Sequence, residues 1–404
     1  MSGRAALICG LSIGICRDII EPMIYLDNNA TTPVDPEVSD AIFSSLRRDF
    51  ANPSSSHRPG RRAREVIENC RVRIAGFLGA GPSEIVFTSG GTESNNLAIL
   101  GTALFYRRGH IITSSIEHPS VINTCRHLKD MGFGVTYLPV DGDGIVNPDD
   151  LRKSIREDTI LISVMHANNE TGVLQPVDEI RSVAKGHGVT FHSDAAQSVG
   201  KMHFYQSSPP ADMMTVVAHK FYGPKGVGAL YVKAGTKINP LFFGAGHEKG
   251  LRPGTENVAG IVGLEKACLL TERDLGLRVS HTSRLRDTLL EGLMSEIPGL
   301  VLNGHRTRRL PNTVNVRISG IYSDVLIEKI AGEVAISAGS ACHSGKHNPS
   351  AVLKQMGLSD EESLSSVRLS LGKDNTEEEI REAVSVISEA VRELRKKPLP
   401  AVTP

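Results

Sequence analysis

Apolar residues along the chain follow two different spacings. Between residues 84 and 232, short runs rich in β-branched residues alternate with longer segments in which apolar residues recur every three or four positions. The short runs are typical of buried strands, and the longer segments are typical of amphipathic helices. Their alternation predicts an α/β lobe with a mainly parallel sheet. The predicted strands cover residues 84–88, 110–115, 135–139, 159–165, 189–194, 213–217 and 230–232.

The pattern changes after residue 257. A long helical segment is followed by an alternating strand pattern, a second strand, and a helix that starts with a Thr376–Glu379 capping box. This mixture predicts a smaller α+β lobe at the C-terminal end. Because 404 residues exceed what one hydrophobic core usually serves, we expect two lobes. The predicted division is an N-terminal extension (1–22), a small lobe (23–32 with 272–397), a large lobe (33–271) and a tail (398–404).

Composition narrows the possible partners and the compartment. Basic and acidic residues are equal in number, 45 each, so no bulk charge attracts nucleic acid or an anionic membrane. Tryptophan is absent and aromatic residues make up 4%, which leaves few platforms for base stacking. The six cysteines form no CxxC pair, which argues against a disulfide framework or a zinc ribbon and fits a reducing compartment. We expect a cytoplasmic protein, and residues 1–22, which fit a short extension better than a targeting segment, leave a mitochondrial location open.

Two predicted strands end in side chains of complementary chemistry. Lys220 follows the strand at 213–217 and precedes a Gly-Pro-Lys-Gly turn, and Asp194 ends the strand at 189–194. A lysine at the end of a buried strand can be an amine nucleophile whose pKa is lowered by burial. Pyridoxal phosphate needs such an amine for its Schiff base, and a carboxylate that keeps its ring nitrogen protonated. The pair therefore favours this cofactor, although Asp194 alone would also be read as a helix cap.

A glycine-rich segment after the strand at 84–88 could bind the phosphate of that cofactor. It reads Ser-Gly-Gly-Thr, includes Gly91 and Thr92, and opens a helix. Glycines let the backbone approach a phosphate, and a helix N-terminus supplies free N–H groups. The segment matches neither GxGxxG nor a Walker loop, which argues against a dinucleotide or nucleoside triphosphate. The simpler alternative is a plain turn in which Thr92 caps the helix.

These motifs together resemble one known family. The segments TSGGTESNN, HANNETG, HSDAAQS, AHKFYGPKG, RPGTEN and GSACHSG occur in the order found in cysteine desulfurases of the aminotransferase class V family, of the type that serves iron–sulfur assembly. The resemblance runs from about Met23 to the helix before Lys397. It implies a pyridoxal-phosphate fold of type I, similar to aspartate aminotransferase. It also implies a homodimer that converts L-cysteine to L-alanine and passes the sulfur to an acceptor or iron–sulfur scaffold protein.

The resemblance also implies residue roles. His118 would lie over the cofactor ring and move protons, Gln197 would bind the ring hydroxyl, and Thr255 would reach the phosphate of the other subunit. Asn168 would contact the ring oxygen and the substrate carboxylate, which Arg368 would clamp. The catalytic residues are then Lys220, His118 and Cys342; the cofactor-binding residues are Gly91, Thr92, Asn168, Asp194, Gln197, His219, Lys220 and Thr255; and the substrate-binding residues are Asn168 and Arg368.

Cys342 is the predicted acceptor of the substrate sulfur. It lies in a segment of glycine, serine and other small residues that predicts a loop able to move, and His343, Lys346 and His347 are nearby. Such neighbours could hold the thiol pKa below its free value of about 8.5. An inert loop cysteine is the simpler alternative, and a metal site formed with the two histidines lacks the usual ligand spacing.

Two other functions stay open at this stage. Many family members carry a serine as a phosphate ligand where this chain has Val217, and some selenocysteine lyases also have an apolar residue there. A selenocysteine lyase is therefore the nearer alternative. A catalytically inactive scaffold subunit is less favoured, because the predicted catalytic and cofactor-binding residues occur together. The sequence does not name the sulfur acceptor.

Overall fold

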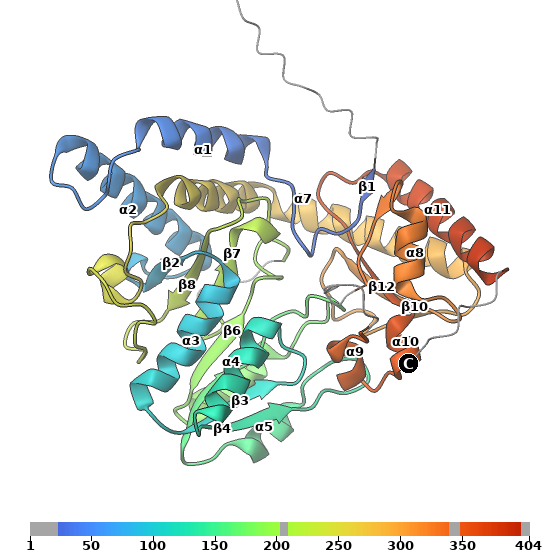
Figure 1. Ribbon diagram of the computed structural model, residues 1–404, viewed down its shortest axis with the longest axis horizontal. Coiled ribbons are helices and arrows are strands. Elements are labelled where there is room, and N and C mark those ends of the chain that lie inside the picture. The colour runs from blue at the N-terminus through green and yellow to red at the C-terminus, as the bar shows by residue number, and fades with distance from the viewer. Residues whose placement is uncertain (1–22, 203–208, 339–347, 397–404) are drawn as a thin grey trace, which may run out of the picture.

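The large part of the molecule is built on a seven-stranded sheet. The computed structural model describes residues 23–202, 209–338 and 348–396 (Figure 1). The strand order is β2-β8-β7-β6-β5-β3-β4, and only β8 runs antiparallel to its neighbours. The strands are β2 (Ile85–Thr88), β3 (His110–Ser114), β4 (Gly134–Leu138), β5 (Thr159–Ser163), β6 (Thr190–Asp194), β7 (Met213–Val217) and β8 (Gly228–Val232).

Helices cover both faces of this sheet, which explains why its strands read as continuous apolar runs. Side chains alternate along each strand, so Ile111 packs with α3 and α4, whereas Ile112 packs with α5 and α6 on the opposite face. At the other end of that second face, the strands pack against α2 and the start of α7. These helices, with α1 packed on α7, are α1 (Pro36–Arg48), α2 (Arg58–Leu78), α3 (Gly91–Tyr106), α4 (Pro119–Asp130), α5 (Pro148–Ser154), α6 (Val177–Gly186) and α7 (Val258–Glu296).

A smaller antiparallel sheet, β12-β10-β9, organises the C-terminal part. A two-stranded parallel pair, β1 with β11, brings the N-terminal segment into the same hydrophobic core. Helices α8 and α11 and the end of α7 complete that core. The elements that lie outside the large sheet and its helices are β1 (Ile24–Tyr25), β9 (Leu300–Leu302), β10 (Thr313–Ile318), α8 (Ser323–Ile330), β11 (Val334–Ala335), α9 (Ala351–Gln355), α10 (Asp360–Leu364), β12 (Ser366–Ser370) and α11 (Glu377–Arg395).

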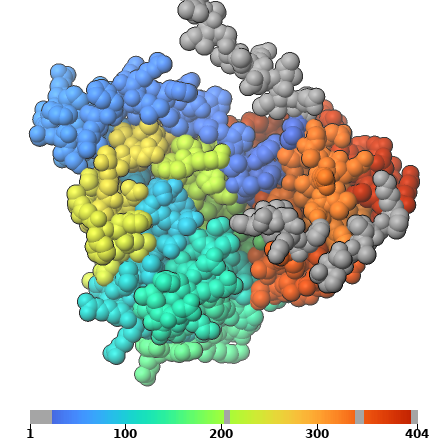
Figure 2. Space-filling model, viewed as in Figure 1, coloured from blue at the N-terminus to red at the C-terminus, as the bar shows by residue number. Residues whose placement is uncertain are grey.

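Helix α7 connects the two parts. Its first half buries Leu264 in the core beneath the large sheet, and its second half buries Leu285 and Leu293 in the C-terminal core. Figure 2 shows the blue N-terminal chain lying where the orange and red C-terminal part meets the rest of the molecule. The predicted α/β fold, with a mainly parallel mixed sheet and a smaller α+β lobe, is confirmed. The residue boundaries assigned to the lobes stay a prediction.

Local sequence signals explain several helix ends. Asp35 caps α1 and Pro36 begins it, and the predicted capping box of Thr376 and Glu379 starts α11. Within the described ranges, no helix combines the length and the apolar character needed to cross a lipid bilayer.

Candidate active site

The predicted catalytic groups gather at the carboxyl ends of the large sheet, where α/β proteins usually bind ligands. Asp194 is the last residue of β6, and Lys220 ends a short 3₁₀ turn, η2 (Ala218–Lys220), directly after β7. Because β6 and β7 are parallel neighbours, the two side chains emerge at the same edge of the sheet. His118 begins α4, in the connection after β3. The sequence prediction of an acid and a lysine at adjacent strand ends therefore has a direct geometric basis.

Lys220 is held as a half-buried amine. Its Nζ donates to the backbone carbonyls of Asn29, at 2.7 Å, and Ala30, at 2.8 Å. Burial, together with the positive charge of Arg368, lowers the pKa of Lys220 to about 8, against the opposing effect of Asp194. A neutral amine has two hydrogens, and the two carbonyls accept both. Its lone pair then remains available to attack an aldehyde carbon.

This pKa predicts how cofactor-free protein should recombine with pyridoxal phosphate. Only the free amine is a nucleophile, and with a pKa of about 8 roughly a tenth of Lys220 is free at pH 7. We expect the recombination rate, followed by absorbance, to rise with pH through a midpoint near 8 and to level off above it. Arg368→Gln, which removes one of the charges that lower the pKa, should move the midpoint upward. A rate that still climbs steeply between pH 9 and 10.5 would contradict the depressed pKa.

Asp194 is positioned by two donors. The Asn95 Nδ2 donates to one carboxylate oxygen at 2.7 Å, and the backbone N–H of Ala196 donates to the other at 2.9 Å. Asn95 lies in the first turn of α3 and is fully enclosed. The sequence analysis did not single it out, although it stands inside the TSGGTESNN motif. The carboxylate is thus held in one orientation at the carboxyl end of β6.

The glycine-rich segment has the shape required to accept a phosphate. Gly90 has φ +148°, and no side chain caps the start of α3, so Thr92 is not the cap. A Cβ atom on Gly91 would lie 2.9 Å from Cγ2 of Val217, so only glycine fits there without a shift. The first turn of α3 therefore offers uncapped backbone N–H groups beside β7. Pyridoxal phosphate, the cofactor that Lys220 and Asp194 indicate, therefore fits the residues present.

Val217 allows a direct test of the phosphate position. We expect Val217→Ser to bind pyridoxal phosphate about 2- to 10-fold more tightly than Val217→Ala, because the added hydroxyl would donate one hydrogen bond. Both variants remove the same methyl contact with Gly91, so the comparison isolates the hydroxyl. Equilibrium dialysis against the cofactor measures the difference. Equal affinities would show that the phosphate does not lie beside residue 217.

Lys201 is a buried lysine that was not predicted to lie in the site. Its Nζ donates to Oε1 of Gln197 at 2.8 Å and to Oδ1 of Asn29 at 2.9 Å. Burial lowers its pKa well below the usual value, and the nearby charge of Lys220 adds to this effect. Oε1 of Gln197 faces Lys201, so Nε2 of Gln197 is the end of the amide that remains as a donor. This nitrogen donates to the Asn29 carbonyl at 3.0 Å. Lys201 thus sets which end of the Gln197 amide faces the site.

His219 lies beside Lys220. Its Nδ1 is 3.1 Å from the hydroxyl of Thr31. Burial and the charge of Lys220 lower its pKa to about 4, so the ring is neutral at physiological pH. A neutral histidine next to the amine does not add a second positive charge to the site.

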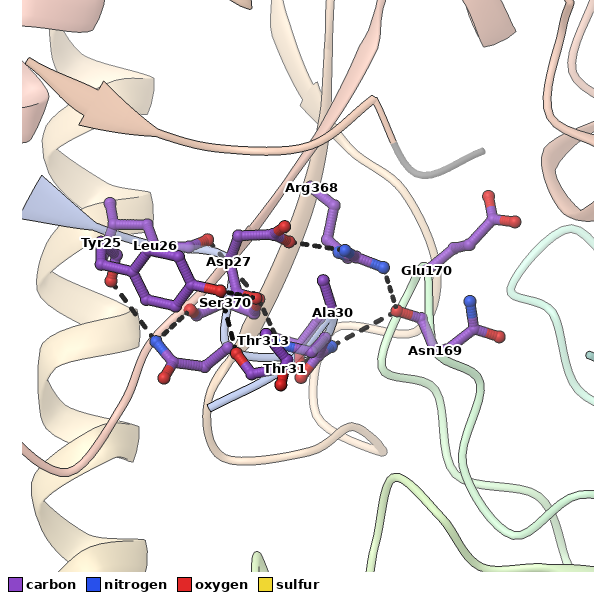
Figure 3. Close-up of polar contacts among 12 residues, drawn as sticks. Tyr25, Leu26, Asp27, Ala30, Thr31, Asn169, Glu170, Thr313, Arg368 and Ser370 are labelled. Atoms are coloured by element: carbon purple, nitrogen blue, oxygen red, sulfur yellow. Dashed lines mark hydrogen bonds and ion pairs between the residues drawn. The ribbon is translucent and has the colours of Figure 1, made fainter. Parts of the chain in front are cut away.

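Arg368, on β12, belongs to a polar cluster at the edge of the C-terminal lobe (Figure 3). Its Nη2 pairs with the Asp27 carboxylate at 2.6 Å, and its Nη1 donates to the Asn169 carbonyl at 3.0 Å. The side chain is 5% exposed, and its Nε has no partner among the described residues. Asp27 was not predicted to take part, since nothing in its local sequence indicates an ion pair with a residue 341 positions away. The positive charge of Arg368 is close enough to Lys220 to lower the pKa of the lysine, so the two groups belong to one site.

The two asparagines of the HANNETG motif have different surroundings. Asn168 is fully buried, and its amide is engaged within its own loop, because Oδ1 accepts from the N–H groups of Glu170 and Thr171. Its Nδ2 donates to the Ile116 carbonyl at 3.0 Å. Asn169 instead contacts Arg368 through its carbonyl. A direct contact of Asn168 with cofactor or substrate stays a prediction.

Two predicted residues are not part of this cluster in the described structure. Thr255 is exposed on the loop before α7. Cys342 lies outside the described residues. Across the three described ranges, no group of three or more histidine, cysteine, aspartate or glutamate side chains is arranged to hold a metal ion.

Comparison with known proteins agrees with this geometry. Residues 24–382 match the family described as aminotransferase class-V. The chain belongs to this family. It is 44% identical to "Cysteine desulfurase IscS" of Dictyoglomus turgidum over 92% of this chain and 95% of that protein, and 47% identical to "Cysteine desulfurase IscS" of Methanosarcina thermophila over 92% and 93%. A solved structure titled "NIFS-LIKE PROTEIN" superposes with a TM-score of 0.86 at 38% identity, over 92% of this chain and 99% of that one.

The family and its relatives confirm the main functional predictions. The fold is the type I pyridoxal-phosphate fold, and the cofactor is pyridoxal phosphate. The chain is a cysteine desulfurase of the kind that serves iron–sulfur assembly. The roles of individual residues are not tested by these comparisons.

Proposed function

We propose that the chain converts L-cysteine to L-alanine with Lys220 as the group that moves the Cα proton and Cys342 as the thiol that takes the sulfur. The observation that supports this most strongly is the Lys220 amine, whose pKa is lowered to about 8 at a sheet edge shared with the Asp194 carboxylate. When bound, pyridoxal phosphate supplies an electron sink for negative charge at Cα. The residues around it provide binding, orientation and proton transfer.

The cofactor-binding residues are assigned by their positions. The first turn of α3, with Gly91 and Thr92, would hold the phosphate through backbone N–H groups. Asp194 would accept from the ring nitrogen, and Gln197 would donate to the ring hydroxyl. His118, to which the resemblance assigns proton transfer, lies at the start of α4. Which ring nitrogen holds its hydrogen decides whether it can accept a proton or only donate one. His219 and Asn168 complete the predicted set.

Arg368 is the proposed site for the substrate carboxylate. Its unpartnered Nε is a donor that a bound carboxylate could satisfy, and a guanidinium binds a carboxylate in a bidentate manner. The existing pair with Asp27 fixes the orientation of the guanidinium before substrate arrives. An amino acid held there would bring its Cα toward Lys220.

Sulfur transfer then requires a thiolate. Sγ of Cys342 attacks the sulfur of the substrate, an S–S bond forms, and the C–S bond breaks. The electron pair of that bond remains on the substrate carbon, which takes up a proton and gives L-alanine. The persulfide on Cys342 is passed to a sulfur-acceptor or iron–sulfur scaffold protein in the cytoplasm.

A homodimer with shared sites is part of the proposal. The loop between β8 and α7 carries Thr255, together with Phe243, which is 93% exposed, and Phe242, which is 53% exposed. Phe43 on α1 and Phe50, just after the end of that helix, are also exposed. Large exposed aromatic side chains are typical of surfaces that a partner covers. A second copy would bury them and could bring its own Thr255 to the phosphate.

A single-turnover experiment with L-cysteine and with L-selenocysteine tests the function. We expect purified protein to show the yellow colour of bound cofactor and to release alanine from L-cysteine. Turnover of selenocysteine alone would move the assignment to a selenocysteine lyase, which the apolar Val217 keeps as a second candidate. Cofactor binding without alanine from either substrate would refute both activities, and protein without cofactor would support a scaffold.

A further inference from the structure

Asn95 connects three functional elements through one amide group. Besides its bond to Asp194, Nδ2 donates to the hydroxyl of Ser120 at 2.8 Å, and Oδ1 accepts from the hydroxyl of Thr215 at 2.7 Å. Asn95 is 1% exposed, so water cannot replace these bonds at low cost. The amide therefore ties α3 to β6, to β7 and to the start of α4.

The direction of each hydrogen bond follows from its neighbours. The Asp194 carboxylate only accepts, so Nδ2 of Asn95 must face it. The Thr215 hydroxyl donates to Asn95, and it can then accept from Nε2 of His192 at 3.1 Å. His192 is neutral, because burial lowers its pKa to about 4, and its Nδ1 accepts from Ser163 at 2.9 Å. The amide thus has one orientation that satisfies every partner.

The same reasoning fixes the ring of His118. The Ser120 hydroxyl accepts from Asn95, so its own hydrogen is free to point to Nδ1 of His118, which lies 2.8 Å away. The backbone N–H of Ser120 also points to this nitrogen, at 3.1 Å, because His118 is the N-cap of α4. With two donors aimed at it, Nδ1 acts as an acceptor and the ring hydrogen lies on Nε2.

We propose that Asn95 is a positioning residue that holds Asp194 with one amide hydrogen and, through Ser120 with the other, locks His118 in the neutral form that carries its hydrogen on Nε2. Protonation of His118 at Nδ1 would break the cap of α4 and place a positive charge at the positive end of that helix. His118 then offers an N–H donor to whatever lies over it, and it does not accept the Cα proton. This inference rests on the proposed function, in which Lys220 is left as the proton acceptor.

The charged groups around His118 act in both directions. Burial is the largest cause that lowers its pKa, Lys220 lowers it further, and Asp194 raises it. Glu117, the preceding residue, is buried, and burial raises its pKa to about 8, so it is mostly uncharged at pH 7. Among these neighbours only Asp194 favours a protonated ring, and the two donors at Nδ1 oppose it.

The ring state can be read directly by nitrogen-15 NMR of histidine-labelled protein loaded with pyridoxal phosphate. The His118 signals are assigned by their loss in His118→Gln. We expect the wild type to keep the neutral Nε2–H pattern from pH 6 to 8.5. A protonated ring at pH 7, or a hydrogen on Nδ1, would overturn the proposal without the need for any other variant.

Two variants and a control test the role of the network. In Ser120→Ala, His118 loses one donor, and its titration midpoint should rise by about half to one pH unit. In Asn95→Leu, the Nδ1–H form should become populated, and the cofactor dissociation constant should rise about 10- to 100-fold because Asp194 loses its charged hydrogen bond. Among the described residues, the Asn96 side chain bonds to the Thr92 carbonyl and the Thr124 hydroxyl and not to Asp194 or Ser120, so Asn96→Ala should match the wild type in both measurements.

These measurements distinguish a failure of the Asn95 network from a failure of the proposed function. An unchanged His118 ring in both Asn95→Leu and Ser120→Ala would overturn the network. If Asn95→Leu does not fold, as judged by circular dichroism, Ser120→Ala and the wild-type titration still decide. Alanine release from L-cysteine is measured separately, so a failure of the proposed function leaves the ring state readable.

Discussion

Lys220→Arg is expected to reduce alanine release from L-cysteine by about three orders of magnitude or more. Arginine keeps the positive charge and most of the length, but its guanidinium does not lose a proton in proteins and cannot serve as the nucleophilic amine. The Lys220 amine would thus be replaced by a group that can neither bond covalently to the cofactor nor accept the Cα proton. Reduction with borohydride followed by peptide mass mapping shows where the cofactor is attached.

Lys201 makes this a discriminating experiment. It is the other amine that contacts Asn29, it is buried, and its pKa is also lowered, so it is the rival nucleophile. We expect Lys201→Met to keep the cofactor mass on the peptide that contains Lys220, and Lys220→Arg to lose it. The exposed Lys225, in the same Gly-Pro-Lys-Gly turn, provides a matched control as Lys225→Arg. Attachment to Lys201 in the wild type would reverse the assignment.

The parts of the site that could be predicted from sequence are those in which one short segment contains both the strand and the functional residue that follows it. Asp194 and Lys220 each follow a strand, and the strand pattern alone places both at the same sheet edge. The ends of the seven strands predicted between residues 84 and 232 lie within one or two residues of the observed ends. The antiparallel direction of β8 depends on long-range pairing that no local pattern records.

The residues that were missed act through partners far along the chain. Asn95 matters because it reaches Asp194, 99 positions away, and Asp27 matters because it pairs with Arg368, 341 positions away. Lys201 would ordinarily be assigned to the surface, since lysine is rarely buried, and only the fold shows that it is enclosed. Asn168 illustrates the opposite case, in which an amide at a functional motif is used to shape its own loop.

The cysteines of the described structure are poor candidates for sulfur transfer. Cys70, Cys125 and Cys268 are all buried. Burial raises the thiol pKa of Cys70 and of Cys125 to about 12 and raises that of Cys268 well above its usual value. Since only a thiolate attacks sulfur, these three groups stay unreactive at neutral pH. The candidates that remain are Cys9, Cys16 and Cys342, of which only Cys342 lies in a segment that resembles the family's motif, GSACHSG.

Cys342→Ala is therefore expected to lose persulfide formation completely and to reduce alanine release in the presence of a sulfur acceptor to background. Cys268→Ala is the matched control, because it removes a thiol of the same size from the interior of α7, away from the site. It should keep both activities and retain the persulfide on Cys342. Mass spectrometry of single-turnover samples measures the added sulfur. A persulfide that persists in Cys342→Ala, or one that disappears in Cys268→Ala, would show that a thiol other than Cys342 accepts the sulfur. Proton transfer by Lys220 would then be followed by sulfur transfer to that other thiol.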